Sequence, residues 1–394
     1  MVEEFLRQRS SKFNGMKEVY CCIHQHGLIT KAELLKRTNM KQTTVVRHLD
    51  ALIQYGLIRI EHYEESSGGR PPALYAIDPK AAFIIGIDLS RVETAITIVD
   101  MSFAPVANYT FQMTEDHTPA YTISVLKKEI AALLKDNEME KKDILGIGLG
   151  TVGPLDRQKG IMYPEAFVAP GWNEVPIVHE IKQAFQTDVF LENGANTAAL
   201  YESINNPEFN KTILYCISGW GLRCGVLTNG TIMQSRKGDA SSFGEMIIDT
   251  KSNRTLSSYI SYNSILEEAE KKINAGEKTI HFYPEKYHKK NEKMDHLLHA
   301  LMKGDPLIEN VVLQSAYYFG VGIANMVNVL HPEVVVLNSD LIRIYPAFYE
   351  KVVKTAETFI FQLNKQHLHF HVAQPTANAV SIGACVLAFQ SHFK

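Results

Sequence analysis

A chain of 394 residues, 45% of them hydrophobic, is long enough for two or three domains with sizeable cores. Its formal net charge of −3 neither indicates nor excludes nucleic-acid binding, because a basic face can be offset by an acidic remainder. The five cysteines lack metal-site or disulfide spacing, the start Met1-Val2-Glu3-Glu4 is charged, and no apolar run reaches membrane-spanning length, so we expect a cytoplasmic protein without membrane association.

The first eighty residues predict three helices and a hairpin. Apolar residues recur at helical spacing in three segments, over about 14–26, 31–38 and 41–55. Gly27 and Gly56 are natural helix stops, and Thr30 with Glu33 forms the capping-box pattern at the second segment. Two short apolar runs, 57–61 and 73–77, flank a turn. Together these elements predict a winged helix-turn-helix domain over residues 1–80.

In such a domain the third helix enters the major groove, and its early polar residues meet base edges and phosphates. The candidates for these contacts are Lys41, Gln42, Thr43, Thr44, Arg47 and His48. Gln and Thr side chains read bases, whereas Lys and Arg more often hold phosphates. A small helical docking domain is the alternative, but such a domain needs neither a polar third helix nor a basic wing.

The wing is the run Ser66-Ser67-Gly68-Gly69-Arg70-Pro71-Pro72. The glycines allow a tight turn and the prolines hold the following chain extended. Gly69 and Arg70 therefore form a slim basic tip, and an arginine presented in this way suits the narrow minor groove of A·T-rich DNA. We expect double-stranded DNA to be a partner.

From residue 81 the pattern becomes that of an α/β domain. Apolar runs predict strands at 83–89, 95–100, 106–111, 144–150, 212–218, 225–228 and 334–338. A helix is predicted over about 121–135, and glycine turns follow several strands, as expected for a cleft at the strand ends. The second half of this domain restates the pattern of the first.

Eight short motifs then resemble those of the ROK family, named for repressors, open reading frames and kinases, in the family's order. Beside the Gly-Gly-Arg-Pro wing they are Gly86-Ile87-Asp88, Gly146-Ile147-Gly148 with Gly153-Pro154, Pro170-Gly171-Trp172, Glu192-Asn193, Asn229-Gly230, Asn325-Met326-Val327-Asn328 and Pro332-Glu333-Val334-Val335-Val336. The resemblance implies the two-lobed fold of actin and hexokinase over residues 81–394, with lobes at about 81–195 and 196–394. It also implies a sugar or sugar derivative as ligand.

The motif that supplies the catalytic base in the family's kinases is altered. Those kinases carry Glu-Asn-Asp, and this chain reads Glu192-Asn193-Gly194. A glycine cannot accept the proton of a sugar hydroxyl, and loss of a positioned base costs about 10²–10⁴-fold in rate. The loops that would approach nucleotide phosphates carry bulkier residues than the family's, namely Ser90-Arg91-Val92, Trp220, Arg223 and Asn338-Ser339. We therefore expect no enzyme activity, no catalytic residue and no nucleotide cofactor.

The family's zinc site is missing from this sequence as well. In the alignment that the resemblance implies, Glu245 replaces the histidine ligand, and no cysteine lies between Gly225 and Cys385. A structural zinc site needs about four nitrogen or sulfur ligands. We expect no metal.

The same alignment gives a candidate effector site that differs from the family's. Its members are Trp172, Asn193, Gly194, Ser242, Glu245 and Ser257. Ser242 and Ser257 stand where glutamates are expected, so an ordinary hexose would leave hydrogen bonds unmade. Two alternatives follow, an altered ligand or a pocket that no longer senses one, and the remaining polar groups favour the altered ligand. Trp172 is either a ligand platform or a lobe-packing residue.

These inferences predict a repressor of carbohydrate-utilisation genes, xylose metabolism among them. A homodimer or tetramer would place two winged domains on an inverted-repeat operator, and a sugar bound between the lobes would shift the population away from the DNA-competent state. The alternatives are a divergent ROK sugar kinase and a ligand-blind DNA-binding protein.

Overall fold

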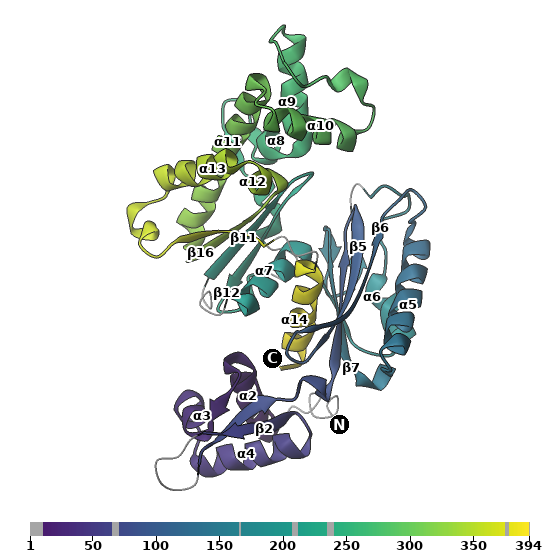
Figure 1. The fold of residues 1–394 in the computed structure, drawn as a ribbon, viewed down its shortest axis with the longest axis vertical. Helices are drawn as coiled ribbons and strands as arrows, with labels where there is room; N and C mark the ends of the chain where they lie inside the picture. Colours follow the sequence, from purple (N-terminus) through teal and green to yellow (C-terminus); the bar gives the residue numbers. More distant parts are fainter. Residues whose placement is uncertain are drawn as a thin grey trace. The chain divides into compact units, whose positions relative to one another are not determined.

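The computed structural model describes residues 11–64, 71–164, 167–206, 212–234, 240–374 and 378–393. The chain divides into two compact units, Met1–Thr197 with Ala377–Lys394, and Ala198–Thr376. Figure 1 shows the strands and helices of both units. Within the described residues, no helix has both the length and the apolar character needed to cross a bilayer.

The N-terminal part of the first unit is a winged helix-turn-helix, as predicted. Its elements are α2 (Ser11–His26), β1 (Ile29–Thr30), α3 (Lys31–Thr38), α4 (Gln42–Gln54), β2 (Ile58–Tyr63) and β3 (Ala73–Ile77). The strands pair in the order β1-β3-β2. The capping box is confirmed, since Thr30 Oγ1 accepts a hydrogen bond from Glu33 N at 3.2 Å and Glu33 Oε2 accepts one from Thr30 N at 2.9 Å.

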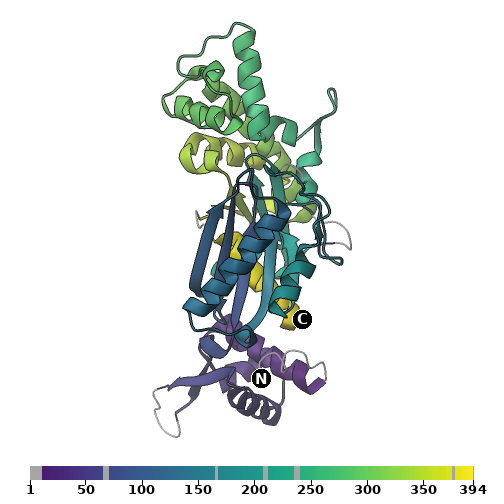
Figure 2. The same cartoon turned by 90° about the vertical axis from the view of Figure 1, so that its right-hand side faces the viewer.

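The first lobe follows in the same unit and contains a five-stranded sheet in the order β10-β7-β4-β5-β6. The strands are β4 (Phe83–Leu89), β5 (Glu93–Asp100), β6 (Pro105–Gln112), β7 (Ile144–Thr151) and β10 (Val189–Asn193), with a small pair formed by β8 (Leu155–Asp156) and β9 (Ile161–Met162). Helices α5 (Pro119–Asp136) and α6 (Ile177–Phe185) cover one face of the sheet and α14 (Ala379–Phe393) the other (Figures 1 and 2). The four strands predicted in this lobe are confirmed to within two residues, whereas β8, β9 and β10 were missed.

The second unit has a sheet of the same design, which confirms that the second half restates the first. Its order is β13-β12-β11-β16-β17, and β11 pairs antiparallel with β12 and parallel with β16, just as β4 pairs with β5 and β7. The strands are β11 (Thr212–Ser218), β12 (Leu222–Thr228), β13 (Thr231–Ile232), β14 (Ile247–Asp249), β15 (Arg254–Thr255), β16 (Val334–Asn338) and β17 (His369–Val372).

The helices of the second unit enclose its core. They are α8 (Ser257–Ile260), α9 (Tyr262–Asn274), α10 (Lys290–Met302), α11 (Pro306–Leu330), α12 (Asp340–Ile344) and α13 (Pro346–Phe359), and α7 (Gly194–Asn205) spans the boundary between the units. Helices α11 and α13 pack against each other along their length. Buried leucine, isoleucine, valine and phenylalanine side chains from these helices and from β11, β12 and β16 form the core.

The C-terminal helix corrects the expected lobe boundaries, because α14 belongs to the first unit and the second unit ends at Thr376. Glycines in β4 and β7 allow the close approach of this helix. A Cβ atom on Gly86 would lie 1.8 Å from the carbonyl oxygen of Ser381, and one on Gly148 would lie 1.8 Å from that of Ala384. Two of the family-like glycine motifs thus serve helix packing in this fold.

The far end of α14 contacts helix α2 of the winged domain. Lys17 Nζ donates a hydrogen bond to the His392 carbonyl at 2.8 Å, and the rings of Tyr20 and Phe393 stack with centroids 5.0 Å apart. His24 lies between Phe103 and Phe389, and burial lowers the pKa of its imidazole. Aromatic packing therefore joins the winged domain to the first lobe.

Candidate DNA-binding surface and effector site

Helix α4 exposes most of the residues predicted to meet DNA. Lys41, which precedes the helix, and Gln42, Thr43 and Arg47 are exposed, and Thr44 is half-buried. A shallow groove of about 590 Å³ runs along this face, lined by Gln42, Thr43, Val46, Arg47, Asp50, Ala51 and Gln54. The exposed face thus combines amide and hydroxyl groups with a guanidinium, the mixture that reads bases and holds phosphates.

The prediction for His48 was wrong. Its side chain is only 2% exposed, and its Nε2 lies so near helix α2 that a Cβ atom on Gly15 would be 2.8 Å from it. His48 follows Val45 by three residues and precedes Leu52 by four, so helical geometry places it on the buried stripe of α4. It is a core residue of the winged domain.

The wing tip residues Gly69 and Arg70 lie outside the described residues, so their predicted role stays a prediction. The structure describes the two strands of the hairpin that carries them. Strands β2 and β3 pair antiparallel, and Glu64 N donates a hydrogen bond to Pro72 O at 2.9 Å. On β2, the Arg59 guanidinium lies 2.6 Å from Glu61 Oε2 in an exposed pair.

In the first lobe the candidate effector residues lie at the end of β10, where α7 begins. Asn193 is 4% exposed, and its Oδ1 accepts a hydrogen bond from Ala195 N at 3.0 Å, so the side chain caps α7. Gly194 is the first residue of that helix. The strand end and the helix start thus fix the backbone of this motif.

The neighbouring Glu192 is held by a residue that the sequence did not single out. Arg157 donates from Nε to Glu192 Oε2 at 2.8 Å and from Nη2 to Oε1 at 2.5 Å. Oε1 also accepts hydrogen bonds from Asn193 N at 2.6 Å and from Asn196 Nδ2 at 2.9 Å. Arg157 lies in a turn without a recognisable motif, so no sequence signal marked it. Both oxygens of Glu192 are therefore engaged.

The turn after β4 is closed by hydrogen bonds of the Ser90 hydroxyl. Ser90 Oγ donates to the Glu93 carbonyl at 2.7 Å and accepts from Glu93 N at 3.4 Å. Phosphate binding by such a turn depends on backbone N–H groups that face the ligand. Here the hydroxyl of Ser90 accepts from two of them, those of Val92 and Glu93, and the Val92 side chain is 53% exposed.

The corresponding loops of the second unit are also filled by side chains. The Trp220 ring packs edge-on against Tyr262 with centroids 5.5 Å apart. Asn338 Nδ2 donates to the Tyr215 hydroxyl at 2.8 Å, and Arg343 Nη1 donates to Asn338 Oδ1 at 2.7 Å. Side chains thus pack and hydrogen-bond within these loops.

The remaining candidate effector residues lie on two adjacent elements of the second unit. Ser242 and Glu245 are exposed on the short helix η4 (Ala240–Glu245), and Ser257 begins α8. A Cβ atom on Gly244 would lie 3.5 Å from that of Ser257, so these two elements are in contact. The oxygen atoms of Ser257 and Thr255 are 3.0 Å apart. Ser242, Glu245 and Ser257 therefore lie on neighbouring elements of this unit.

Trp172 has the environment of a packing residue. It is 6% exposed, and its indole N–H donates to the His117 carbonyl at 2.9 Å. Its ring stacks on Phe167 with centroids 4.4 Å apart, within the core of the first lobe. Of the two alternatives for Trp172, these contacts match lobe packing, since the hydrogen-bonding group and a ring face are both in use.

The residues that the structure describes do not fit a zinc ion. Glu245 stands at the position of the expected histidine and is exposed. Among the described residues, no three histidine, cysteine, aspartate or glutamate side chains lie close enough together to hold a metal. A closed structural zinc site needs about four such ligands, mostly sulfur and nitrogen.

Comparison with known proteins identifies both parts of this chain. The ROK family model matches residues 84–391, and the MarR family model matches residues 18–66. The chain is 24% identical to the xylose repressor of Caldicellulosiruptor bescii over 91% of both proteins. It is 23% identical to that of Bacillus subtilis over 81% of this chain and 80% of the relative.

Solved structures agree on the fold. A ROK family transcriptional regulator described as a homolog of the Escherichia coli Mlc protein superposes with a TM-score of 0.79 at 19% identity, covering 97% of each chain. A ROK hexokinase from Thermus thermophilus superposes with a TM-score of 0.64 at 21% identity, over 78% of this chain and 98% of that chain. The regulator covers more of this chain than the hexokinase does, and the additional part corresponds to the winged domain, which precedes the kinase-like part. The chain belongs to the ROK family.

Proposed function

We propose that this protein is a DNA-binding transcriptional repressor of carbohydrate-utilisation genes. The observation that carries the proposal is the pairing of an exposed polar helix, α4, with a kinase-like domain whose catalytic-base position is Gly194. A kinase does not need a DNA-binding helix such as α4, and it does need the catalytic base that is missing at Gly194. A sensor that controls transcription accounts for both.

The proposed DNA-binding set is Lys41, Gln42, Thr43, Thr44 and Arg47, with Gly69 and Arg70 at the wing tip. His48 is left out because it is buried. A homodimer or tetramer would present two such surfaces to an inverted-repeat operator, because protein symmetry and operator symmetry match. We place the protein in the cytoplasm, where the DNA is.

The proposed effector is a sugar or sugar derivative held by Asn193, Gly194, Ser242, Glu245 and Ser257. Xylose is the first compound to test, because several relatives carry the name xylose repressor. Relative to the family's glutamates, serines at 242 and 257 offer shorter and uncharged hydroxyls. Binding would shift the population of conformers away from the one that binds DNA.

We further propose that the kinase-like domain is catalytically inactive. Gly194 supplies no base, both oxygens of the adjacent Glu192 are engaged, and Ser90 occupies an N–H of the phosphate turn. The Gly194→Asp variant therefore stays inactive toward ATP and xylose in a coupled kinase assay. Appreciable turnover by this variant would contradict our interpretation of the nucleotide loops.

Selection of genomic fragments by the purified protein, with and without xylose, tests the proposal directly. We expect enrichment of one inverted-repeat sequence near carbohydrate genes at near-physiological salt, and its loss when the effector is present. Enrichment that no sugar changes would indicate a ligand-blind DNA-binding protein. Failure to enrich any site, with or without sugar, would contradict the repressor proposal.

A further inference from the structure

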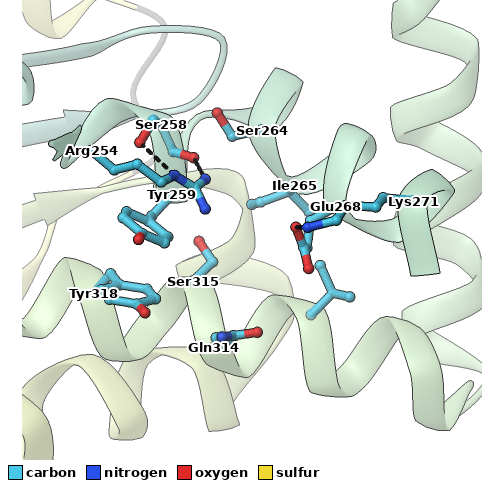
Figure 3. A pocket seen from close by; sticks show the side chains of 11 residues that line it. Arg254, Ser258, Tyr259, Ser264, Ile265, Glu268, Lys271, Gln314, Ser315 and Tyr318 are labelled. Carbon is cyan, nitrogen blue, oxygen red and sulfur yellow. Dashed lines mark hydrogen bonds and ion pairs between the residues drawn. The ribbon is translucent and has the colours of Figure 1, made fainter. Parts of the chain in front are cut away.

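A small pocket lies in the second unit, and none of the candidate effector residues lines it. It opens between α8, α9 and α11 and has a volume of about 90 Å³. Figure 3 shows its lining, whose polar and aromatic groups come from Arg254, Ser258, Tyr259, Ser264, Glu268, Lys271, Gln314, Ser315 and Tyr318. The pocket is small and lined by polar groups, so it suits a compact polar ligand.

Arg254 forms one wall and is held in a fixed position. Its Nη2 donates to the Ser258 carbonyl at 2.5 Å and its Nε donates to Ser258 Oγ at 3.3 Å (Figure 3). The guanidinium carbon lies 3.8 Å from the centre of the Tyr259 ring, which itself stacks on Tyr318 at 3.8 Å. The side chain is therefore pre-organised, and little rotamer freedom remains to be lost on binding.

The charge of Arg254 is not neutralised by a salt bridge with any described carboxylate. The other charged residues of the lining are Glu268 and Lys271, which pair with each other at 3.7 Å. Asp249 lies beyond Tyr259, and its carboxylate accepts hydrogen bonds from Ser252 Oγ at 2.6 Å and from the Tyr259 hydroxyl at 3.1 Å. The lining thus carries one net positive charge, on a guanidinium that has N–H groups to spare.

Ser315 provides an independent observation on the opposite wall. The residue is only 3% exposed and lines the pocket, yet its Oγ has no hydrogen-bond partner among the described residues. A buried hydroxyl without a partner is costly, and such groups are rare in native structures unless something else satisfies them. Here the hydroxyl can donate to an acceptor placed in the pocket.

We propose that this pocket binds a compact oxyanion of phosphate size, held by Arg254 and the Ser315 hydroxyl. An arginine recognises tetrahedral or planar oxyanions through two parallel N–H bonds, and a serine hydroxyl complements it as a neutral donor. Gln314 adds a further amide at the rim. The anion is either inorganic phosphate or the phosphate end of a sugar phosphate whose remaining atoms stay outside the pocket.

Occupancy of the pocket is linked to helix α8. Ser258 and Tyr259 on this helix hold the guanidinium of Arg254, and Ser264 Oγ of α9 donates to the Ser257 carbonyl at 3.1 Å. If the proposed effector role of Ser257 holds, an anion that orders α8 also affects the sugar site. The anion site itself does not depend on that role.

Thermal unfolding of the full chain tests the site, with sodium phosphate compared against sodium chloride at equal ionic strength. We expect millimolar phosphate to raise the Tm above the chloride value, because a ligand that binds only the folded state stabilises it. Glucose 6-phosphate is the second probe. A shift with the sugar phosphate and none with phosphate would assign the pocket to a phosphorylated metabolite, and the reverse would assign it to the free anion.

Variants locate the binding. Titration calorimetry should show roughly tenfold weaker phosphate binding by Arg254→Met. The loss should be smaller for Arg254→Lys, because lysine keeps the charge but lacks the paired N–H groups of the guanidinium. Binding by Ser315→Ala should be several-fold weaker than that of the wild type. Without ligand, Ser315→Ala keeps or raises the Tm, because it removes an unpaired buried hydroxyl. Lys351→Met, which alters a cation 5.7 Å from the Tyr317 ring outside the pocket, is the matched control and should bind normally.

The proposal is overturned if neither phosphate nor glucose 6-phosphate changes the Tm of the wild type. It is equally overturned if the shift survives in Arg254→Met and Arg254→Lys but disappears in Arg47→Ala, since the anion would then bind the DNA-binding surface. These measurements use neither DNA nor xylose, so their failure leaves the proposed repressor function untouched.

Discussion

The guanidinium of Arg157 binds both carboxylate oxygens of Glu192, whose side chain is 2% exposed. Glu192 in turn accepts hydrogen bonds from the backbone of Asn193 and the side chain of Asn196. The charge pair, 35 residues apart in the sequence, thus fixes the end of β10 at the point where α7 begins. The Glu192-Asn193 motif is thus part of a buried polar network.

Removing one partner of this pair should strongly destabilise the protein. Arg157→Met leaves the carboxylate of Glu192 buried without its counter-charge, and we expect a loss of about 3–5 kcal/mol in urea unfolding. The double variant Arg157→Met, Glu192→Gln should recover part of that loss, because no uncompensated charge remains. The exposed pair Lys182–Asp188 is the control, and Lys182→Met should cost less than about 1 kcal/mol. Equal losses for both pairs would contradict a special role for Arg157.

Gly148 should tolerate no side chain. A Cβ atom there would lie 1.8 Å from the Ala384 carbonyl oxygen, so Gly148→Ala must push α14 away from the sheet. We expect a loss of about 3 kcal/mol or more, measured by denaturant unfolding. The control is Gly219→Ala, whose Cβ would meet Tyr262 at an ordinary 3.7 Å and should change stability much less.

Adjacent residues of α4 should respond in opposite ways. Arg47 is exposed, so Arg47→Ala should leave the Tm unchanged. The variant should bind duplex DNA more weakly, and the salt dependence of that binding should fall by about one counterion. Fluorescence anisotropy with a labelled duplex at several salt concentrations measures both quantities. A variant that binds with unchanged affinity and salt slope would exclude Arg47 from the interface.

His48→Ala should instead lower the stability of the winged domain. Its side chain fills the contact between α4 and α2 beside Gly15, and truncation leaves a cavity. We expect a loss of about 1–3 kcal/mol by thermal or urea unfolding. A stable variant with impaired DNA binding would return His48 to the DNA-contacting set.

Glu202 gives the free energy of unfolding a predictable pH dependence. Burial raises the pKa of this carboxyl from 4.5 to about 7, against the opposing effect of the hydrogen bond from Asn206. Between these two values the folded chain binds more protons than the unfolded chain, so stability falls as the pH rises through this window. The contribution is about 3 kcal/mol, fully present below the lower value and lost above the upper one.

The Glu202→Gln variant isolates this effect. Its free energy of unfolding, relative to that of the wild type, should rise by about 3 kcal/mol from about pH 4.5 to pH 7 and then level off. The exposed Glu267→Gln change on α9 is the control and should follow the wild-type curve. Parallel curves for Glu202→Gln and the wild type would show that the carboxyl titrates normally.

Local signals in the sequence were reliable where the structure is built from local geometry. The capping box at Thr30, the winged domain and the strands β4, β11 and β16 all depend on neighbouring residues and on hydrophobic periodicity. Strands β10 and β17 were missed because they are short and only partly apolar, and their pairing with β7 and β16 is what defines them as strands.

The sequence by itself determined the family, the winged domain and the glycine at position 194 in place of a base, since identity and local pattern are properties of the chain alone. The tertiary structure decided which face each side chain presents. It turned His48 into the core, enclosed Trp172 in a packed lobe, brought Arg157 to Glu192 and returned α14 to the first unit. Those outcomes depend on contacts between residues distant in sequence, and burial and pairing exist only once such contacts form.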